Sequence, residues 1–514
     1  MAYKVYHYNK KNGVTYVYEA VSTWDKEKKS PRNKQVCIGK LDKETGEFIP
    51  SKRLNPEQAA VRDPNVTATA LAVGPSMILD KITTELGLEL ILKKAFPKTY
   101  KELLTLAYFI AQRGNALSHC SNWGKSFQNP SGTPLISQRI SSLLSEQTES
   151  ERQAFFKSWF KQMREDFYCY DITSISSYSE FNEYVKYGYN RDGEDLPQIN
   201  LAMLLGQTSK LPVYYNRLPG NIADVSTLTH LIKTLNKLDV SKLHFILDRG
   251  FYSKSNIDSL FDRRQKFTIS VSNHIKWVQE VIDEFRDEIE SPKYYHKVGT
   301  ESLYMTTKAY KWNGKRAYAH VYYNSYRAAE IQDKFMWNLL TYKEELTSGQ
   351  LVKKHEEYYK RYFIISETHK RGIKVEFNDE EIKRYKNRYG GFFVILTNDI
   401  KDAFEALQVY RNKDTIEKGF DDLKSQIDMK RLRIHRSAAM DGRLFVQFLA
   451  LIYICAIRNK IHEKKELKHY TVRELLGEME SLSKITYSGK YGSIQTVMSK
   501  QQKIILNAFN INMA

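Results

Sequence analysis

The sequence has few cysteines, and the four that are present lie far apart in the chain: Cys37, Cys120, Cys169 and Cys455. No CxxC pair occurs among them. This spacing excludes a zinc knuckle and a dense disulfide framework. Widely spaced thiols are typical of a protein that stays in a reducing cytoplasm.

Long apolar runs are also missing. The N-terminal residues MAYKVYHYNKKNG lack the apolar segment of a secretion signal. The longest apolar stretch, residues 444–457, is interrupted by Gln447 and is shorter than the roughly 20 residues that span a bilayer. We therefore expect a soluble protein with no membrane partner.

Glycine and proline are scarce, at 24 and 12 of 514 residues, whereas hydrophobic residues make up 42% and aromatic residues 13%. A disordered chain has the opposite composition. The chain is also longer than one hydrophobic core usually serves. We expect a folded protein with roughly two to four structural units.

Acidic residues are outnumbered, since 60 Asp and Glu face 79 Lys and Arg and leave a net charge of +19. Such a positive field raises the local concentration of phosphate polyanions, so nucleic acid is the first partner to consider. A coding bias towards AT-rich codons also enriches lysine and accounts for part of the excess. The charge alone therefore does not identify the partner.

Hydrophobic periodicity predicts an α/β protein with several domains. Residues 3–55 alternate polar with aromatic or β-branched types, which indicates a small antiparallel sheet. Residues 75–165 follow the helical period instead. From 167 onwards the pattern predicts three strands, a helix and a fourth, buried strand that ends at Asp248.

The segment after this strand predicts an insertion. It is rich in strand-like patterns and shows no long helical periodicity before Asp379. Helical stretches at 401–427 and 441–463 then complete the core. The predicted parts are an N-terminal β module (1–55), a helical module (56–164), the first part of a core domain (165–254), a β-rich insertion (255–389), the second part of the core (390–463) and a C-terminal segment (464–514).

The segment 410–424 places four polar side chains within an arc of about 60° on one face of a predicted helix: Tyr410, Lys413, Glu417 and Lys424. Beside them runs an apolar stripe that would dock the helix on a sheet: Ile416, Phe420, Leu423 and Ile427. Taken alone, such a polar face is most often a solvated charged stripe. Docking would nevertheless hold Glu417 in a defined position.

Three carboxylates form a candidate catalytic set. Asp171 within one predicted strand and Asp248 at the end of another would be positioned rigidly, and Glu417 on the helix would reach across to them. Phosphoryl transfer on DNA uses two hard cations about 4 Å apart, and such cations take oxygen ligands. The set therefore predicts residues that hold two Mg²⁺ or Mn²⁺ ions. The alternatives are a loop cap at Asp248 and a buried, hydrogen-bonded Asp171.

The predicted helix resembles the signature Tyr-x2-Arg-x3-Glu-x6-Lys of a large superfamily of bacterial insertion-sequence DDE transposases. Tyr410, Glu417 and Lys424 match it position for position. Lys413 stands in place of the Arg, which keeps the charge but loses the two-donor geometry towards phosphate. The resemblance implies a catalytic domain with an RNase H-like fold.

Two further segments resemble the same family. YDITSIS at 170–176 is similar to the motif of its first Asp, and DRGFYS at 248–253 to the motif of its second. The 169 positions from Asp248 to Glu417 resemble a family in which a β-rich insertion splits the catalytic fold before the Glu helix. The resemblance covers residues from about 165 to 460.

The resemblance implies metal-dependent cleavage at the ends of an insertion sequence, followed by attack of the freed 3′-OH on target DNA without a covalent enzyme intermediate. It implies double-stranded DNA as partner, a homodimer on that DNA, and a place on the nucleoid in the bacterial cytoplasm. Tyr410, Lys413 and Lys424 would grip the phosphates that flank the scissile bond. The modules 1–55 and 56–164 are candidates for recognising the terminal inverted repeats.

A basic segment, MKRLRIHR at 429–436, follows the Glu helix and contains no acidic residue. Its Arg431 and Arg433 are expected to lie along a DNA backbone. A solvated loop is equally compatible with the pattern.

Two other functions are compatible with the same carboxylates. An RNase H-like nuclease or resolvase would cleave DNA without strand transfer. A domesticated DNA-binding protein would have lost catalysis, and the presence of all three carboxylates argues against it. A strand-transfer assay separates transposition from simple hydrolysis.

Overall fold

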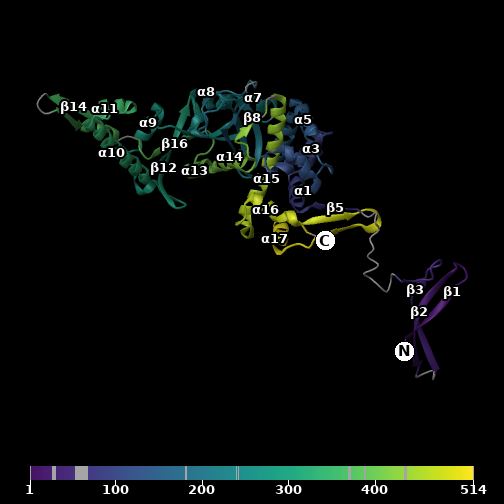
Figure 1. Ribbon diagram of the computed structural model, residues 1–514. Helices are drawn as coiled ribbons and strands as arrows, with labels where there is room; N and C mark the ends of the chain where they lie inside the picture. Colours follow the sequence, from purple (N-terminus) through teal and green to yellow (C-terminus); the bar gives the residue numbers. More distant parts are fainter. Residues whose placement is uncertain are drawn as a thin grey trace. The chain divides into compact units, whose positions relative to one another are not determined.

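The computed structural model divides into two compact units, which Figure 1 colours along the sequence: unit 1 comprises Met1–Ala70 and Lys484–Thr496, and unit 2 comprises Leu71–Ser483 and Val497–Ala514. The structure describes residues 2–25, 30–51, 67–179, 182–238, 240, 242–368, 372–386, 389–432, 434 and 437–512. Two units replace the six predicted parts, because most of the chain shares one hydrophobic core.

Unit 1 contains the antiparallel sheet that the sequence predicts in residues 3–55. Its strand order is β1-β2-β3-β4, with β1 (Ala2–Asn9), β2 (Val14–Asp25), β3 (Ser30–Leu41) and β4 (Phe48–Pro50). A second small sheet has the order β19-β18-β5, with β5 (Ala68–Ala72), β18 (Ser483–Tyr487) and β19 (Ser493–Gln495). Among the described residues of the four-stranded sheet, the buried hydrophobic ones are Val17 and Ala20. This sheet therefore has almost no core of its own.

A ten-stranded sheet forms the centre of unit 2, in the order β11-β12-β13-β16-β10-β9-β6-β7-β8 with β17 (Arg431–Leu432) paired beside β6. β7 runs antiparallel to β6 and β8, whereas β9 and β10 run parallel to β6. This is the arrangement of an RNase H-like core, and it confirms the predicted fold class. The core strands are β6 (Tyr168–Ser177), β7 (Gln198–Gly206), β8 (Pro212–Pro219), β9 (His244–Leu247) and β10 (Lys266–Val271).

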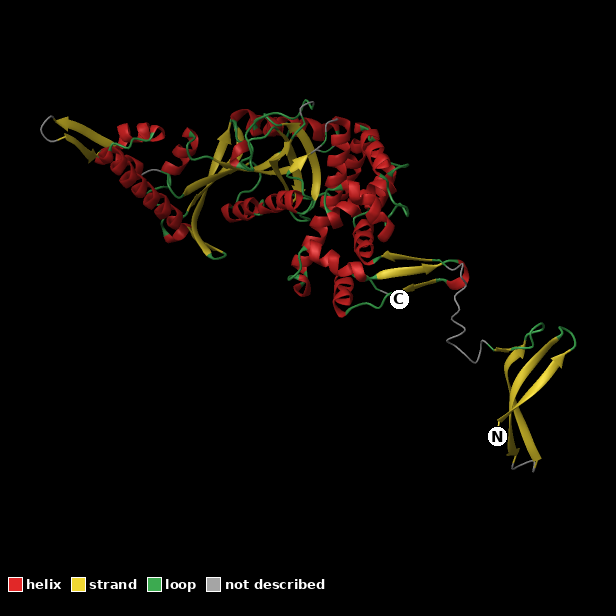
Figure 2. Cartoon of the chain, viewed as in Figure 1, coloured by secondary structure: helices red, strands yellow, loops and turns green. Residues whose placement is uncertain are grey.

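Helices cover this sheet and share its hydrophobic core, and Figure 2 shows them in red beside the yellow strands. The predicted helical module 56–164 is therefore not separate from the core domain: α3 and α5 contact α15 (Ser437–Glu463), and α6 contacts β8. The helices before the sheet are α1 (Gly74–Glu85), α2 (Leu88–Ala95), α3 (Tyr100–Arg113), α4 (Cys120–Ser126), α5 (Ser137–Glu146) and α6 (Glu149–Gln162). Those between or after the strands are α7 (Asp224–Lys237), α8 (Lys254–Asp262), α9 (Lys276–Asp283), α16 (Val472–Glu478) and α17 (Lys500–Ala508).

The most apolar helix is α15, which is long and apolar enough to cross a membrane by length and composition alone. Most of its apolar stretch is buried inside the protein. Gly442 permits the close packing, because a Cβ there would meet the carbonyl oxygen of Leu144 on α5 at 2.0 Å. The apolar composition of α15 is thus explained by burial on all sides in the protein core.

The predicted insertion differs from the structure in its boundary. β10 falls within residues 255–389, yet it lies in the core sheet between β9 and β16 (Phe392–Thr397). Beyond β16 the same sheet continues through β11 (Tyr295–Val298), β12 (Glu301–Trp312) and β13 (Lys315–Tyr323). These three inserted strands therefore extend the core sheet, whereas β14 (Phe363–Thr368) and β15 (Gly372–Phe377) pair with each other in a separate two-stranded sheet.

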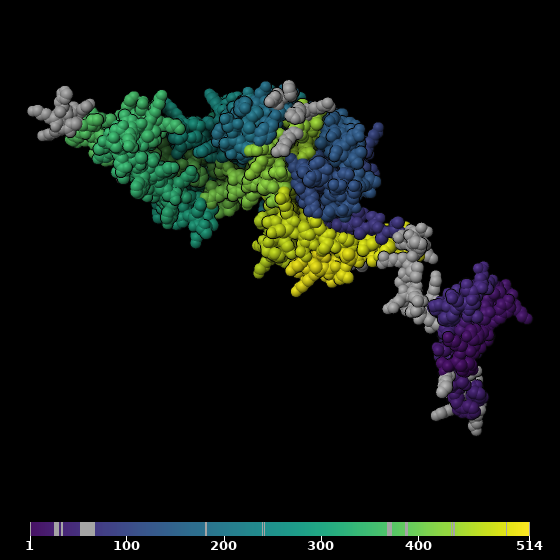
Figure 3. All heavy atoms as spheres, in the orientation of Figure 1, coloured from purple at the N-terminus to yellow at the C-terminus, as the bar shows by residue number. Residues whose placement is uncertain are grey.

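The insertion also contains a 24-residue helix, α10 (Ser325–Ser348), where the sequence predicts no long helix. Its buried residues form a single narrow stripe of Phe335, Leu339, Tyr342 and Leu346, which is too sparse to stand out among the charged positions. The stripe belongs to a small hydrophobic cluster that is separate from the main core. It includes residues of α11 (Glu356–Tyr362), β14 (Phe363–Thr368), β15 (Gly372–Phe377) and α12 (Asp379–Lys386), drawn in green in Figure 3.

Candidate active site

Asp171 and Asp248 lie next to each other at one edge of the core sheet. β9 pairs in parallel with β6, and Tyr170 lies opposite Leu247. The next position in the same register brings Asp171 beside Asp248, on strands about 4.8 Å apart. Asp171 is also the one residue of β6 that is not fully buried. Parallel pairing therefore makes two carboxylates, 77 positions apart in the chain, converge.

Asp248 is held by three groups. Its Oδ1 accepts hydrogen bonds from the Tyr410 hydroxyl at 2.8 Å and from its neighbouring backbone N–H, that of Arg249, at 2.9 Å. The ammonium of Lys413 lies 3.3 Å from Oδ2. Burial favours the neutral acid, but these partners outweigh burial and hold the pKa of Asp248 below its ordinary value. Asp248 is therefore a carboxylate at neutral pH.

The polar face that the sequence assigns to one helix is divided between two helices. α13 (Ala403–Arg411) carries Tyr410, α14 (Asp414–Ser425) carries Glu417 and Lys424, and Lys413 precedes α14. The single helix predicted over 401–427 is therefore wrong. The amide of Gln207 donates to the carbonyl of Val409 at 2.7 Å, which is the acceptor that a continuous helix would offer to the N–H of Lys413.

The N–H of Lys413 bonds instead to the carbonyl of Tyr410 at 3.1 Å, so the backbone tightens at this point. The break does not separate the predicted groups. Lys413 Nζ lies 3.3 Å from Asp248 Oδ2 and 3.3 Å from Glu417 Oε1. One ammonium thus links the carboxylate of β9 to the carboxylate of α14.

Asp171 has a different environment from Asp248. Burial is the main influence on it and raises its pKa to about 6, against a hydrogen bond from the N–H of Ile172 and the positive charge of Arg191. The negative charge of Asp248 raises the pKa further. Asp171 is therefore harder to ionise than Asp248, despite the positive charge of Arg191.

The three carboxylates fit a hard divalent cation in the chemistry of their donor atoms. All offer oxygen, which Mg²⁺ and Mn²⁺ prefer. Within the part of the chain that the structure describes, no group of three or more His, Cys, Asp or Glu side chains is arranged as a closed metal site. A cationic group, the Lys413 ammonium, lies between two of the three predicted ligands. The region therefore suits positive charge.

The other predicted DNA-binding residues lie beyond this edge and are ion-paired. Lys424 Nζ lies 2.6 Å from Asp192, and Arg431 lies 2.7 Å from Glu194. Arg431 is in β17, which pairs with β6, so this part of the predicted basic loop is a short strand beside the core. Arg433 lies outside the described residues. The segment 429–436 contains no acidic residue, so its own sequence did not indicate these partners. The loop between β6 and β7 provides them.

That loop contains the residues that sequence reasoning missed. Arg191 contacts both carboxylate oxygens of Asp224 at 2.6 Å and lies close enough to Asp171 to lower its pKa. Asp192 and Glu194 follow. The signal available in the sequence was the charged turn segment NRDGED at 190–195, directly after the first-Asp strand.

A buried ion pair fixes α14 in place. Asp422 on α14 pairs with Arg458 on α15, and Arg458 also donates to the carbonyl of Lys418 at 2.9 Å. Burial raises the pKa of Asp422 to about 6, in opposition to the charge of Arg458. The apolar residues Ile416, Phe420 and Leu423 are buried as the predicted stripe requires. Packing on both sides of α14 therefore positions Glu417.

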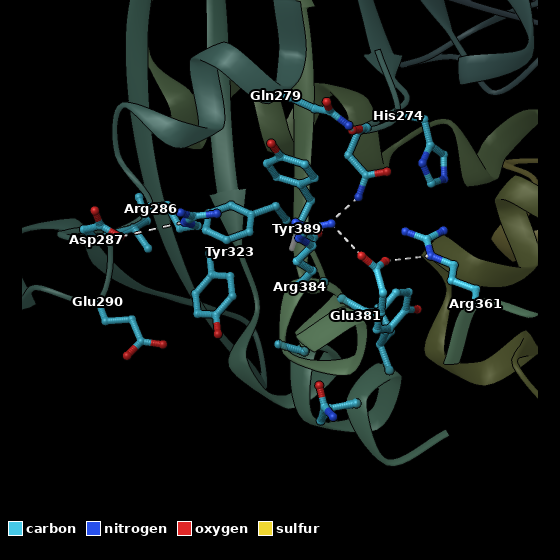
Figure 4. A pocket seen from close by; sticks show the side chains of 18 residues that line it. His274, Gln279, Arg286, Asp287, Glu290, Tyr323, Arg361, Glu381, Arg384 and Tyr389 are labelled. Atoms are coloured by element: carbon cyan, nitrogen blue, oxygen red, sulfur yellow. Dashed lines mark hydrogen bonds and ion pairs between the residues drawn. The ribbon is translucent and has the colours of Figure 1, made fainter. Parts of the chain in front are cut away.

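A cavity of about 900 Å³ in unit 2 is lined by no predicted site residue. It lies between the ends of the insertion strands, α10 and α12, where Arg361 and Arg384 both bond to Glu381 (Figure 4). Tyr389 at its wall donates to Asp283 at 3.0 Å. None of the candidate catalytic or DNA-binding residues lines this cavity, so it adds nothing to the carboxylate site.

The fold and the site define an RNase H-like protein with a convergent carboxylate centre. Residues 162–453, more than half of the chain, match the family model described as the transposase DDE domain. The chain therefore belongs to the transposase DDE domain family, as the sequence resemblance predicts.

Comparisons with individual proteins add a distant likeness. No curated protein matches the sequence. Among solved structures, the chain is similar to the cryo-EM structure of a piggyBac transposase synaptic complex with hairpin DNA, with 10% sequence identity and a TM-score of 0.37. The alignment covers 79% of this chain and 77% of that one.

Proposed function

We propose that this transposase acts by cutting and pasting: it cleaves DNA at the ends of an insertion sequence and joins the freed 3′ ends to target DNA. One observation carries the proposal. Asp171 and Asp248 directly follow Tyr170 and Leu247, which lie opposite each other on neighbouring parallel strands, while Lys413 links Asp248 to Glu417. Membership of the transposase DDE domain family supports the class of reaction.

Asp171, Asp248 and Glu417 are the proposed catalytic residues, which would hold two Mg²⁺ or Mn²⁺ ions. Such ions, when bound, activate the attacking oxygen and stabilise the leaving 3′ oxygen. Tyr410 restricts the orientation of Asp248 by donating to its Oδ1. Lys413 offsets the repulsion between Asp248 and Glu417, so that two negative groups stay close together.

Phosphates of the DNA backbone are the proposed ligands of three cations, Lys413, Lys424 and Arg431. Cations at fixed positions orient the backbone without reading its sequence. The net charge of +19 adds a general attraction for DNA. Tyr410 is committed to Asp248, and we propose it as a positioning residue in place of the phosphate contact that the sequence predicts.

We extend the proposal to the assembly. Pairing two ends of one element requires two active sites, so we propose a homodimer on DNA. Unit 1 is the proposed reader of the terminal repeats, supported by aromatic side chains that are exposed on its strands, including Tyr6, Tyr8 and Trp24. Deleting residues 1–51 should then weaken binding to end DNA and leave binding to arbitrary duplexes largely unchanged.

The inverted repeats that flank the gene would define the substrate for a direct test. A labelled duplex with one such repeat is incubated with the protein, Mg²⁺ or Mn²⁺ and a supercoiled target plasmid. Cleavage at the repeat boundary followed by joined plasmid products is the expected result. Cleavage without joining would favour a nuclease, and no metal-dependent cleavage beyond that of the Glu417→Gln variant would contradict the proposal.

A further inference from the structure

The loop between β6 and β7 carries three acidic residues within four positions: Asp192, Glu194 and Asp195. We call residues 190–195 the acidic loop. It begins at Asn190, whose side-chain oxygen accepts from the N–H of Asp192 at 2.8 Å and whose amide donates to Ser176 on β6 at 3.1 Å. The loop is thus shaped locally and tied to the strand that carries Asp171.

Two of the three acids cover cations proposed to bind DNA. Asp192 lies 2.6 Å from Lys424, whose side chain is only 13% exposed. Glu194 accepts two hydrogen bonds from Arg431, at 2.7 and 3.2 Å, and this guanidinium lowers the pKa of Glu194. Glu194 is therefore charged at neutral pH. The two carboxylates occupy the donors that a phosphate would need.

The third acid is different. Asp195 is exposed, next to Glu194 in the chain, and no ion pair is seen for it among the described residues. Arg191, on the other side of Asp192, anchors the loop to Asp224 at the start of α7. The loop therefore spans from α7 across the catalytic edge to α14 and β17, and it presents two carboxylates to two cations on separate elements.

Carboxylate and phosphate oxygens make equivalent charge-assisted hydrogen bonds to Lys and Arg. Partly exposed ion pairs such as Arg431 with Glu194 are individually weak in water, so a polyanion is able to replace them. DNA brings many phosphates at once and gains from counterion release, whereas the loop supplies only two charges. A competition between loop and backbone for the same cations is the physical consequence.

We infer that the acidic loop is a built-in mimic of the DNA backbone, which covers Lys424 and Arg431 in the free protein and is displaced when DNA binds. The inference rests on the proposed function, since it assumes that this edge meets DNA. It gives the enzyme a barrier against arbitrary duplexes, because weak contacts elsewhere do not suffice to displace the loop.

The test compares Asp192→Asn/Glu194→Gln with the wild type in a salt titration of binding to a labelled, repeat-free duplex, measured by fluorescence anisotropy. The double variant should bind about 5- to 20-fold more tightly at low salt. Its plot of log K against log salt should be steeper by up to about two units, since two cations then exchange small counterions for phosphates.

The matched control is Asp195→Asn together with Asp258→Asn, which changes the net charge by the same two units without uncovering Lys424 or Arg431. An equal gain in this control would overturn the inference, as would unchanged affinity and slope in the loop variant. Lys424→Ala should reduce the affinity for the repeat-free duplex slightly in the wild type and much more in the loop variant. Equal losses of affinity in the two backgrounds would also contradict the inference.

The folded state of each variant is checked by its thermal unfolding. If the double variant is misfolded, Lys424→Ala and Lys424→Gln are tested in the protein with its natural acidic loop. Each should change the affinity for the repeat-free duplex by less than 2-fold. A large loss of affinity would show that the loop does not cover Lys424 and would contradict the inference. A wild type that neither binds nor cleaves end DNA would instead contradict the proposed function, which separates the two failures.

Discussion

The hydroxyl of Tyr410 donates a hydrogen bond of 2.8 Å to Oδ1 of Asp248, although the two residues are 162 positions apart in the chain. Asp248 follows a parallel strand, and Tyr410 is at the end of α13, beyond the whole insertion. The same carboxyl group meets Lys413 through its other oxygen. The carboxylate of Asp248 is therefore one of the points at which the second half of the core contacts the first.

Tyr410→Phe should slow metal-dependent cleavage by roughly 10- to 100-fold, because a hydrogen bond to a charged group is worth about 1.5–3 kcal/mol. The expected cause is a misplaced Asp248, so the Mg²⁺ concentration for half-maximal cleavage should rise as well. Cleavage assays across a Mg²⁺ series measure both. Tyr326→Phe, at a Tyr that is 78% exposed on α10, is the matched control. Equal effects of the two substitutions would contradict the positioning role.

Asp171→Asn, Asp248→Asn and Glu417→Gln should each reduce cleavage of end DNA by at least about 10³-fold, because each removes a charged ligand that the cations require. Binding to end DNA should persist within a few-fold. Gel-based cleavage and anisotropy on the same preparations separate the two effects. Cleavage at the wild-type rate in any of the three would remove that residue from the catalytic set.

Lys413→Ala should impair cleavage more than Lys413→Arg does. Alanine leaves Asp248 and Glu417 without the ammonium that lies 3.3 Å from each, whereas arginine restores the charge and the family's two-donor geometry. We expect a loss of about 10-fold or more for Ala, and activity within a few-fold of the wild type for Arg. Cleavage rates of the two variants and the wild type are compared at matched protein and metal concentrations. A fully active Lys413→Ala would show that the ion pairs of Lys413 with Asp248 and Glu417 are dispensable.

Asp171→Asn should make the metal-free protein more stable at pH 7.5. Burial raises the pKa of Asp171 from 3.8 to about 6, so the folded state favours the protonated form. The stability that this proton contributes is present below about pH 4 and is lost as the pH rises through about 6. Asparagine does not ionise, so the variant avoids that loss, and its free energy of unfolding should be higher by roughly 1–3 kcal/mol at most.

Denaturant unfolding of both proteins in EDTA, between pH 4 and pH 8, tests this effect. The advantage of the variant should shrink as the pH falls through 6 to 4. Asp195→Asn, at an exposed loop position, should show no such trend. An advantage that is constant with pH would show that ionisation of Asp171 is not its source.

Residues 401–427 fold differently from their local pattern. Periodicity alone predicts one helix there, and the apolar residues Ile416, Phe420 and Leu423 are buried as expected. The break before α14 depends on Gln207, from the end of β7, which captures the carbonyl of Val409. No pattern within the helix itself contains that information, because the competing donor comes from another part of the chain.

The insertion shows the same limit. β10 has the pattern of any buried strand, and its place between β9 and β16 follows from pairing partners that only the folded sheet selects. The stripe of α10 buries few residues, so the helical period is weak against a charged background. In this region the local sequence pattern indicates where strands occur, but it does not indicate which sheet each strand joins.

The sequence by itself determined the α/β class, the N-terminal antiparallel sheet and the membership of the DDE transposase family, because periodicity and motif spacing are local properties of the chain. It also predicted Asp171, Asp248 and Glu417 as the catalytic residues, and that assignment stays a prediction. Only the tertiary structure decided which charges meet. Lys413 lies between two carboxylates, and Lys424 and Arg431 are covered by Asp192 and Glu194 from a loop more than 230 positions away. Such pairs depend on strand register and helix docking, which bring together residues that no spacing in the sequence connects.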